Sequence, residues 1–128
     1  MPNKPTISVV IPVYNGAKFL SQAIRSVLDQ TWRNFELIIV DNASDDDSLK
    51  VARNYRDSRI FIHAEKNHVP IYANFNRAAG YARGKYIKFL CADDVLLPAS
   101  LETLLQIMMR IAKYLAVMMS YSLVNETN

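Results

Sequence analysis

Continuous apolar runs alternate along the chain with segments in which apolar residues recur every three or four positions. The runs ISVVIPV (7–13) and FELIIV (35–40) are rich in β-branched residues, which is typical of strands buried on both faces of a parallel sheet. Between them, residues 17–29 carry the paired apolar stripe of an amphipathic helix. The alternation predicts successive β-α units.

The same alternation continues through the rest of the chain. A helix is predicted through residues 49–55, and Ser44 and Asp47 before it have the spacing of a capping box. Pro70 and Pro98 mark the starts of two further helices. The remaining predicted elements are strands at 59–63, 85–91 and 115–124 and helices at 70–82 and 99–113. This order predicts an α/β fold with an open, mostly parallel, Rossmann-like sheet and helices on both faces, in three layers.

Length and composition fit a single globular domain spanning residues 1–128. The 128 residues are 51% hydrophobic and 21% charged, which is enough apolar material for one core. The net charge of +3 is small, and the basic residues are scattered rather than grouped. The chain therefore lacks the basic patch of a nucleic-acid-binding protein.

The single cysteine and the most apolar stretch exclude two kinds of structure. With only Cys91, the chain can form no intrachain disulfide and no cluster of Cys and His metal ligands. At the end of a predicted strand, Cys91 is expected to be a small buried hydrophobic residue. The stretch 104–124 is interrupted by Arg110 and Lys113, so its uncharged runs fall short of the roughly 20 residues that cross a bilayer. It predicts buried core and no transmembrane segment.

Polar and aromatic side chains follow three predicted strands at the point where each strand ends. Tyr14 follows the first strand, Asp41 and Asn42 the second, and Asp93 and Asp94 the fourth. Ligands of open α/β sheets bind beyond the carboxyl ends of the strands. An aromatic face can stack on a nucleobase, an amide or carboxylate can pair with its edge, and adjacent carboxylates can hold a divalent cation that neutralises a diphosphate.

Each of these features also has a structural interpretation. Acidic residues after a strand often cap the next helix or lie in solvent, which would explain Asp93 and Asp94. Tyr14 alone would more often be a ring at the edge of the core. His68, at the exit of the third strand, has no assigned role. With three glycines in the chain, neither G-x-G-x-x-G nor a phosphate-binding P-loop can be built.

Two long stretches resemble glycosyltransferase family 2, the inverting enzymes of the GT-A fold. They are ISVVIPVYNGAKFLSQAIRSVLDQTWRNFELIIVDNASDDDS and NFNRAAGYARGKYIKFLCADDVLLP, and the resemblance covers about residues 5–124. It implies a nucleotide-sugar donor and a divalent cation, Mn²⁺ or Mg²⁺, held at a D-x-D-like motif. CADD (91–94) occupies that position.

The resemblance also implies roles for individual residues. Pro12, Val13 and Tyr14 would line the nucleotide base, with Tyr14 stacked on it, and Asp41 or Asn42 would pair with the base edge. Asp93 would approach the ribose or the metal, and Asp94 would ligate the metal. Asn74 and Arg77 are further candidates for donor contacts.

Three positions depart from the family pattern. Asn42 stands where many members have a second acid, which leaves the base preference open. Cys91 replaces the first acid of the fullest D-x-D-D form. Val69 and Pro70 follow Asn67 where many members have a glycine.

Length is the largest departure, because family members continue with an acceptor-binding half. The general base is therefore expected beyond residue 128, no catalytic residue is identified in the chain, and residues 1–128 are expected to bind donor without transferring sugar. The apolar surface near 104–124 would be free for a homodimer.

The function implied is transfer of a sugar, with inversion, from a nucleotide-diphosphate-sugar to a hydroxyl group of a saccharide or lipid-linked acceptor. A UDP-sugar is the first candidate donor, and cell envelope polysaccharide synthesis is the expected process. The expected location is the cytoplasm, with peripheral attachment to the inner face of the membrane as a variant. Two alternatives stay open: a nucleotidyltransferase, for which PVYNGAKF is poor in glycine and basic residues, and a nucleotide-binding module without turnover.

Overall fold

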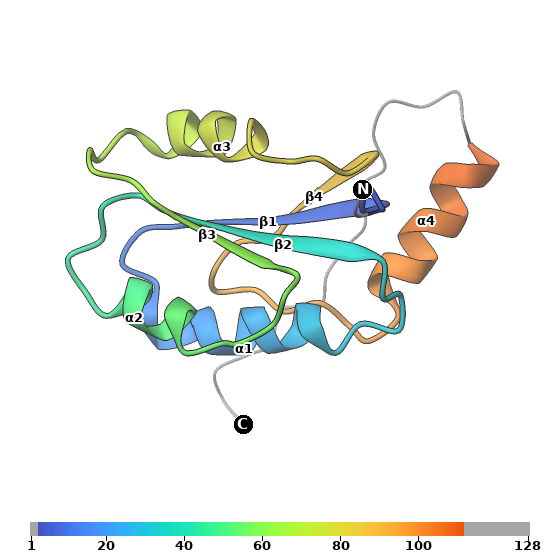
Figure 1. The fold of residues 1–128 in the computed structure, drawn as a ribbon, viewed down its shortest axis with the longest axis horizontal. Helices are drawn as coiled ribbons and strands as arrows, with labels where there is room; N and C mark the ends of the chain where they lie inside the picture. Colours follow the sequence, from blue (N-terminus) through green and yellow to red (C-terminus); the bar gives the residue numbers. More distant parts are fainter. Residues whose placement is uncertain (1–2, 112–128) are drawn as a thin grey trace.

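The computed structural model describes residues 3–111 as a parallel β-sheet with helices packed around it (Figure 1). The elements in chain order are β1 (Ile7–Val13), α1 (Ala17–Leu28), β2 (Phe35–Asp41), α2 (Ser48–Arg53), β3 (Ile60–Ala64), α3 (Ile71–Ala79), β4 (Tyr86–Phe89) and α4 (Ser100–Arg110).

The sheet has the order β3-β2-β1-β4, and every pair is parallel. Val13 lies beside Asp41, so β1 and β2 end level with each other, and Val10 lies beside Phe89 of β4. The chain builds outward from β1 to β3 and then returns to the other side of β1. The strand order thus reverses between β1 and β4, the place where ligands bind in open α/β sheets.

Helices cover both faces of the sheet, which confirms the predicted α/β class (Figure 1). Helices α1 and α2 lie under one face and α3 lies over the other. The larger core fills the α1 side and includes Leu101 and Leu105 of α4, whereas a smaller cluster around Val10 and Ile38 lies beneath α3. All residues of β1 and β2 are buried because both strands are central, which is the reason that all but Ser8, Glu36 and Asp41 are apolar.

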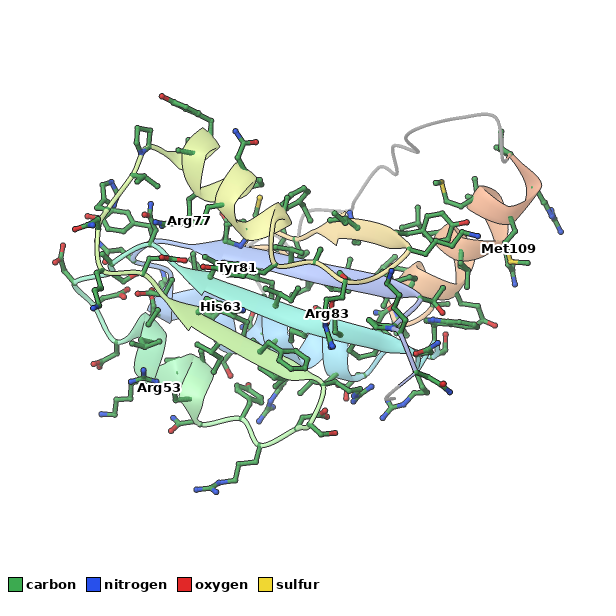
Figure 2. All side chains as sticks on the ribbon, turned by 45° about the horizontal axis from the view of Figure 1, so that its top comes forward. Arg53, His63, Arg77, Tyr81, Arg83 and Met109 are labelled. Carbon is green, nitrogen blue, oxygen red and sulfur yellow. The ribbon has the colours of Figure 1, made fainter. Side chains whose placement is uncertain are left out.

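Two predictions in the C-terminal part fall wholly or partly outside the described residues. The fifth strand at 115–124 lies outside them, and the face proposed for a homodimer is described only to residue 111. Within α4, Leu105 is buried and Met109 is 71% exposed, pointing away from the sheet (Figure 2). None of the helices in residues 3–111 combines the length and hydropathy needed to cross a bilayer.

Two local predictions were wrong. Strand β4 ends at Phe89, and the loop then turns through a hydrogen bond from Asp94 N to the Cys91 carbonyl, so Cys91 is exposed rather than buried. Ser44 and Asp47 form no capping box. Helix α2 begins at Ser48, whose backbone N–H donates to Oδ1 of Asp46 at 2.9 Å.

Candidate functional site

A cavity of about 720 Å³ opens at the carboxyl ends of β1, β2 and β4, beside the first turn of α3. Six of the residues predicted from sequence line it: Pro12, Val13, Tyr14, Asn42, Asn74 and Asp93. Asp41, Arg77 and Asp94 do not line it. The predicted set therefore divides into a group at the cavity wall and a group behind it.

One end of the cavity is aromatic. The Tyr14 side chain is 47% exposed, so it is not part of the core, and its hydroxyl lies 3.5 Å from Oδ2 of Asp45. The ring of His68 lies against it, with 4.3 Å between centroids and 51° between planes. The ring of Tyr14 is thus held in place while much of its surface stays accessible.

The Asn42 side chain lines the cavity but is also part of its scaffold. Its Nδ2 donates to the Val69 carbonyl at 2.8 Å, and its Oδ1 accepts from Val69 N at 2.9 Å. This pair of bonds ties the loop before α3 to the end of β2. Asp41 is buried behind the cavity wall, where Oδ2 accepts from Ser44 N at 3.1 Å and Oδ1 has no hydrogen-bond partner within the described chain.

Arg77 joins α3 to the loops that border the cavity (Figure 2). Its Nη2 donates to Oδ1 of Asn42 and to Oδ1 of Asn74, both at 2.8 Å, and its Nη1 lies 3.6 Å from Oε2 of Glu65. Asn74 is buried and faces the cavity. Arg77 is therefore a positioning residue that fixes Asn42 and Asn74, which the sequence pattern alone did not reveal.

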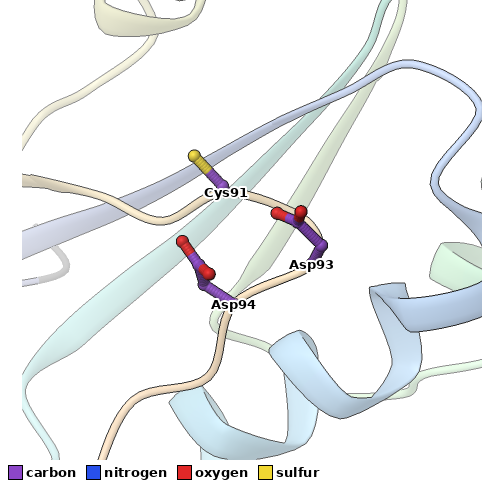
Figure 3. Close-up of side chains that lie close together, drawn as sticks. All are labelled: Cys91, Asp93 and Asp94. Atoms are coloured by element: carbon purple, nitrogen blue, oxygen red, sulfur yellow. The ribbon is translucent and has the colours of Figure 1, made fainter. Parts of the chain in front are cut away.

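The other end of the cavity is acidic and contains a thiol (Figure 3). One ligand atom from each of Cys91, Asp93 and Asp94 lies within 4.8 Å of the other two. Partial burial raises the pKa of the Cys91 thiol, and the carboxylates of Asp94 and Asp93 raise it further. Burial lowers the pKa of nearby Lys88, against the opposing effect of Asp94. Carboxylate oxygens suit a divalent cation, so this donor set fits one.

Two residues beside the cavity adopt a left-handed backbone without being glycine. Asn15 has φ of 51° and Ala43 has φ of 54°. Asn15 is compensated because its Oδ1 accepts from Asp45 N at 2.8 Å. Alanine has no such compensation, so the loop that follows Asp41 and Asn42 is strained at Ala43.

Replacing Ala43 by glycine is expected to stabilise the protein. Left-handed backbone costs a residue with a Cβ about 1–2 kcal/mol, part of which is returned as extra freedom of glycine in the unfolded chain. We expect the free energy of unfolding, measured by urea titration, to rise by about 0.5–1 kcal/mol. Ala79→Gly, at the last residue of α3, is the control and should not raise it, because glycine is unfavourable in a helix. A loss of stability in Ala43→Gly would contradict the assigned strain.

Sequence reasoning assigned no role to the apolar wall of the cavity. Phe19 of α1, Ile71 and Phe75 of α3, and Ala92 complete the lining. Phe19 and Phe75 belong to helical stripes that predicted core contacts, and nothing in a stripe shows that one of its residues borders a cavity. His68 was expected near this edge, and its contacts with the Tyr14 ring and, through Nδ1 at 3.2 Å, with the backbone oxygen of Asn42 give it a role.

Comparison with known proteins gives a consistent result at the level of sequence. The family model described as Glycosyl transferase family 2 matches residues 8–127. An uncharacterised glycosyltransferase of Rickettsia prowazekii is 32% identical over 123 residues, which is 95% of this chain and 38% of that protein. The putative glycosyltransferase EpsE of Bacillus subtilis is 34% identical over 105 residues, covering 80% of this chain and 38% of that protein. The chain thus spans well under half of the length of these relatives.

Solved structures share the fold. Staphylococcus aureus TarS (residues 1–349) superposes with a TM-score of 0.78 at 22% identity, over 84% of this chain and 33% of that one. The mannosyltransferase PcManGT of Pyrobaculum calidifontis, solved with GDP-Man and Mn²⁺, superposes with a TM-score of 0.72 at 23% identity, over 88% of this chain and 34% of that one. TarS has also been solved in complex with UDP-GlcNAc.

Proposed function

The chain belongs to glycosyltransferase family 2, and from this premise we propose that its cavity binds the nucleoside diphosphate part of a nucleotide-sugar donor. The observation that carries the proposal is the layout of the cavity, with an accessible aromatic ring at one end and carboxylates at the other. In a nucleotide the base and the diphosphate lie at opposite ends of the molecule, so a site that binds both needs an aromatic end and a separate metal-binding end. UDP-GlcNAc and GDP-Man, the ligands of the TarS and PcManGT structures, give the donor class to test.

The base would lie at the aromatic end. Tyr14 offers a ring face, and Pro12 and Val13 form the apolar wall beside it. Base selection would fall to Asn42 or Asp41. Asn42 reaches the cavity, and its Nδ2 has a second hydrogen to donate beyond the bond to Val69. Uracil and guanine differ in the acceptors they present there, so this position would decide between them.

The diphosphate would lie at the acidic end, with Asp93 as the first metal residue. The sequence ranked Asp94 above Asp93, but Asp93 lines the cavity and Asp94 does not, so we reverse that order. A divalent cation, Mn²⁺ or Mg²⁺, would neutralise the diphosphate and stabilise the charge that grows on it as it leaves. Without a cation, the carboxylates would repel the same group.

Residues 1–128 would form the donor-binding portion of a transferase that inverts configuration. In such a reaction a base takes the proton of an acceptor hydroxyl, whose oxygen attacks the anomeric carbon opposite the leaving diphosphate. Of the acids near the cavity within residues 3–111, Asp93 and Asp94 would lie on the diphosphate side, Asp41 is buried, and Asp45 contacts the hydroxyl of Tyr14 at the base end. The base, the saccharide or lipid-linked acceptor and the site of action at the inner face of the membrane would depend on the whole protein.

The test of the proposal is a calorimetric titration of the chain with UDP, GDP, UDP-GlcNAc and GDP-Man, each with Mn²⁺ and with a chelator. We expect binding of one nucleotide series, dependent on Mn²⁺. Binding of neither series under any metal condition would overturn the proposal. Release of pyrophosphate from a nucleoside triphosphate would favour the nucleotidyltransferase alternative.

Replacing Tyr14 by alanine is expected to weaken the binding of that nucleotide. Stacking on an aromatic side chain is worth about 1–3 kcal/mol per base, so affinity should fall by that amount. Tyr14→Phe is the matched control and should retain most of the affinity, because it keeps the ring and loses only the long contact with Asp45. Unfolding curves should be similar for all three proteins because Tyr14 is exposed. Equal affinities for Tyr14→Ala and Tyr14→Phe would show that the base binds elsewhere.

A further inference from the structure

The acidic end of the cavity has a sulfur atom where an oxygen ligand would be ordinary. Cys91 lines the cavity together with Asp93, and its thiol is exposed. Its Sγ and one carboxylate oxygen each from Asp93 and Asp94 all lie within 4.8 Å of one another (Figure 3). The three residues occupy four consecutive positions, so the loop after β4 presents all of them from one short segment.

Resting on the proposed nucleotide-sugar site, we propose that Cys91 is a thiolate ligand of the divalent cation held by Asp93 and Asp94. The site then binds Zn²⁺ and similar thiophilic ions in preference to Mg²⁺. Thiolates favour soft and borderline ions, whereas sites made of carboxylate, carbonyl and water oxygens suit Mg²⁺ and Mn²⁺. A single sulfur in the set is enough to shift this preference.

The spacing of the three side chains fits one ion. Zinc lies about 2.3 Å from sulfur and about 2.0–2.2 Å from carboxylate oxygen, so two of its tetrahedral ligands are about 3.5 Å apart. The ligand atoms are up to 4.8 Å apart. Rotation of the three side chains can shorten these distances, because the residues lie in the loop after β4 and not in the strand. Three protein ligands leave a coordination position open, which a diphosphate oxygen can take.

The bound ion makes Cys91 a thiolate against the opposing charge of its two carboxylate neighbours. Coordination removes the thiol proton, which passes to solvent as the metal–sulfur bond forms. One thiolate and two carboxylates carry three negative charges against two on the ion. A diphosphate adds more negative charge, and the excess is met in part by Lys88, which lies close enough to interact with Asp94.

A cadmium titration of the chain tests the proposal directly. Cys91 is the only cysteine, so the near-ultraviolet thiolate-to-cadmium charge-transfer band reports on this residue alone. We expect the band to saturate at one Cd²⁺ per chain, to disappear on addition of Zn²⁺, and to persist in excess Mg²⁺. Cys91→Ser should abolish the band. Loss of a group that only supports a metal ligand weakens metal binding by about 10–100-fold, and loss of the ligand itself should weaken Cd²⁺ binding by at least as much.

Two variants separate a built site from a lone reactive thiol. Cys91→Asp keeps three ligands but makes them all oxygen, and it should abolish the band and lower the ratio of Cd²⁺ affinity to Mn²⁺ affinity below that of wild type. The double variant Asp93→Asn with Asp94→Asn should weaken Cd²⁺ binding while leaving the thiol in place. Cadmium affinity unchanged in the double variant would show that the thiol binds alone and would overturn the proposal.

Nucleotide binding distinguishes failure of this inference from failure of the proposed function. If wild type and Cys91→Ser bind UDP or GDP equally with Mn²⁺ and no cadmium band forms, the thiolate ligand is overturned and the donor site stands. If the cadmium band and its dependence on the two aspartates are observed but no nucleotide binds, the thiolate site stands and the proposed function fails.

Discussion

The variant Asp93→Asn is expected to lose the Mn²⁺-dependent part of nucleoside diphosphate binding. Asp93 is the carboxylate that lines the cavity, so in the proposed site it would contact both the ion and the diphosphate. Loss of a group that merely supports a metal ligand lowers metal affinity by about 10–100-fold, and loss of the ligand itself should lower it by at least as much. Calorimetric titration with UDP or GDP, whichever the wild type binds, in the presence of Mn²⁺ measures the effect.

The sign of the effect should reverse when the metal is removed. In a chelator, the Asp93 carboxylate repels the diphosphate, so Asp93→Asn should bind the nucleotide more tightly than wild type. A simple packing defect would weaken binding under both conditions. Asp94→Asn is the matched control. In Mn²⁺ it should lose less nucleotide affinity than Asp93→Asn does, because Asp94 does not line the cavity. If both variants bind as wild type does with Mn²⁺, the CADD segment is only a turn.

The variant Glu36→Ala is expected to cause the largest loss of stability. Glu36 is 2% exposed near the amino end of the central strand β2, where it accepts hydrogen bonds from Oγ of Ser8 at 2.6 Å and from Arg83 N at 2.8 Å. Nε and Nη2 of Arg83 complete the set at 2.9 and 2.8 Å (Figure 2). A buried donor left unsatisfied costs about 1–3 kcal/mol, and the variant leaves the buried Ser8 hydroxyl and the partly buried Arg83 N–H without an acceptor, so we expect a loss of about 2–3 kcal/mol in urea unfolding.

The control for Glu36→Ala is removal of its partner, in the variant Arg83→Ala. The Arg83 side chain is 53% exposed, so solvent already screens its ion pair with Glu36. Arg83→Ala keeps the backbone N–H that Glu36 accepts and should therefore cost much less than Glu36→Ala. Equal losses in the two variants would contradict the assignment of the effect to the buried donors.

Acid should weaken the same interaction. Burial raises the pKa of Glu36, but the hydrogen bonds from Ser8 and from the backbone and side chain of Arg83 together outweigh it, and the net pKa is below the ordinary value of 4.5. A carboxyl group whose folded pKa is lowered contributes stability that is fully present above its unfolded pKa and is lost as pH falls through the folded pKa. The free energy of unfolding should thus fall below about pH 4.5, and Glu36→Gln should flatten that part of the profile.

Sequence by itself determined the element order, the parallel sheet and the edge at which the site lies. The reason is that periodicity is a local property: β1 and β2 are mostly apolar because both faces are covered, and α1 and α3 are apolar on one side because one face is covered. Parallel strands connected by helices must end at the same edge, so the residues after them had to meet. The positions of Tyr14 and Asp93 at the cavity follow from that.

Tertiary structure decided which of the neighbouring residues face the cavity. The side chains of adjacent loop residues point in different directions, and the residue types in the sequence do not predict which of them will face the cavity. Asp93 and Asp94 are chemically identical in the sequence, yet Asp93 lines the cavity with Cys91 and Ala92, whereas Asp94, whose N–H closes the turn onto the Cys91 carbonyl, does not. Arg77 stays a predicted donor contact, and the packing of α3 on the sheet adds that its guanidinium donates to Asn42 and Asn74. Such contacts join residues far apart in the chain, and only folding brings them within hydrogen-bonding distance.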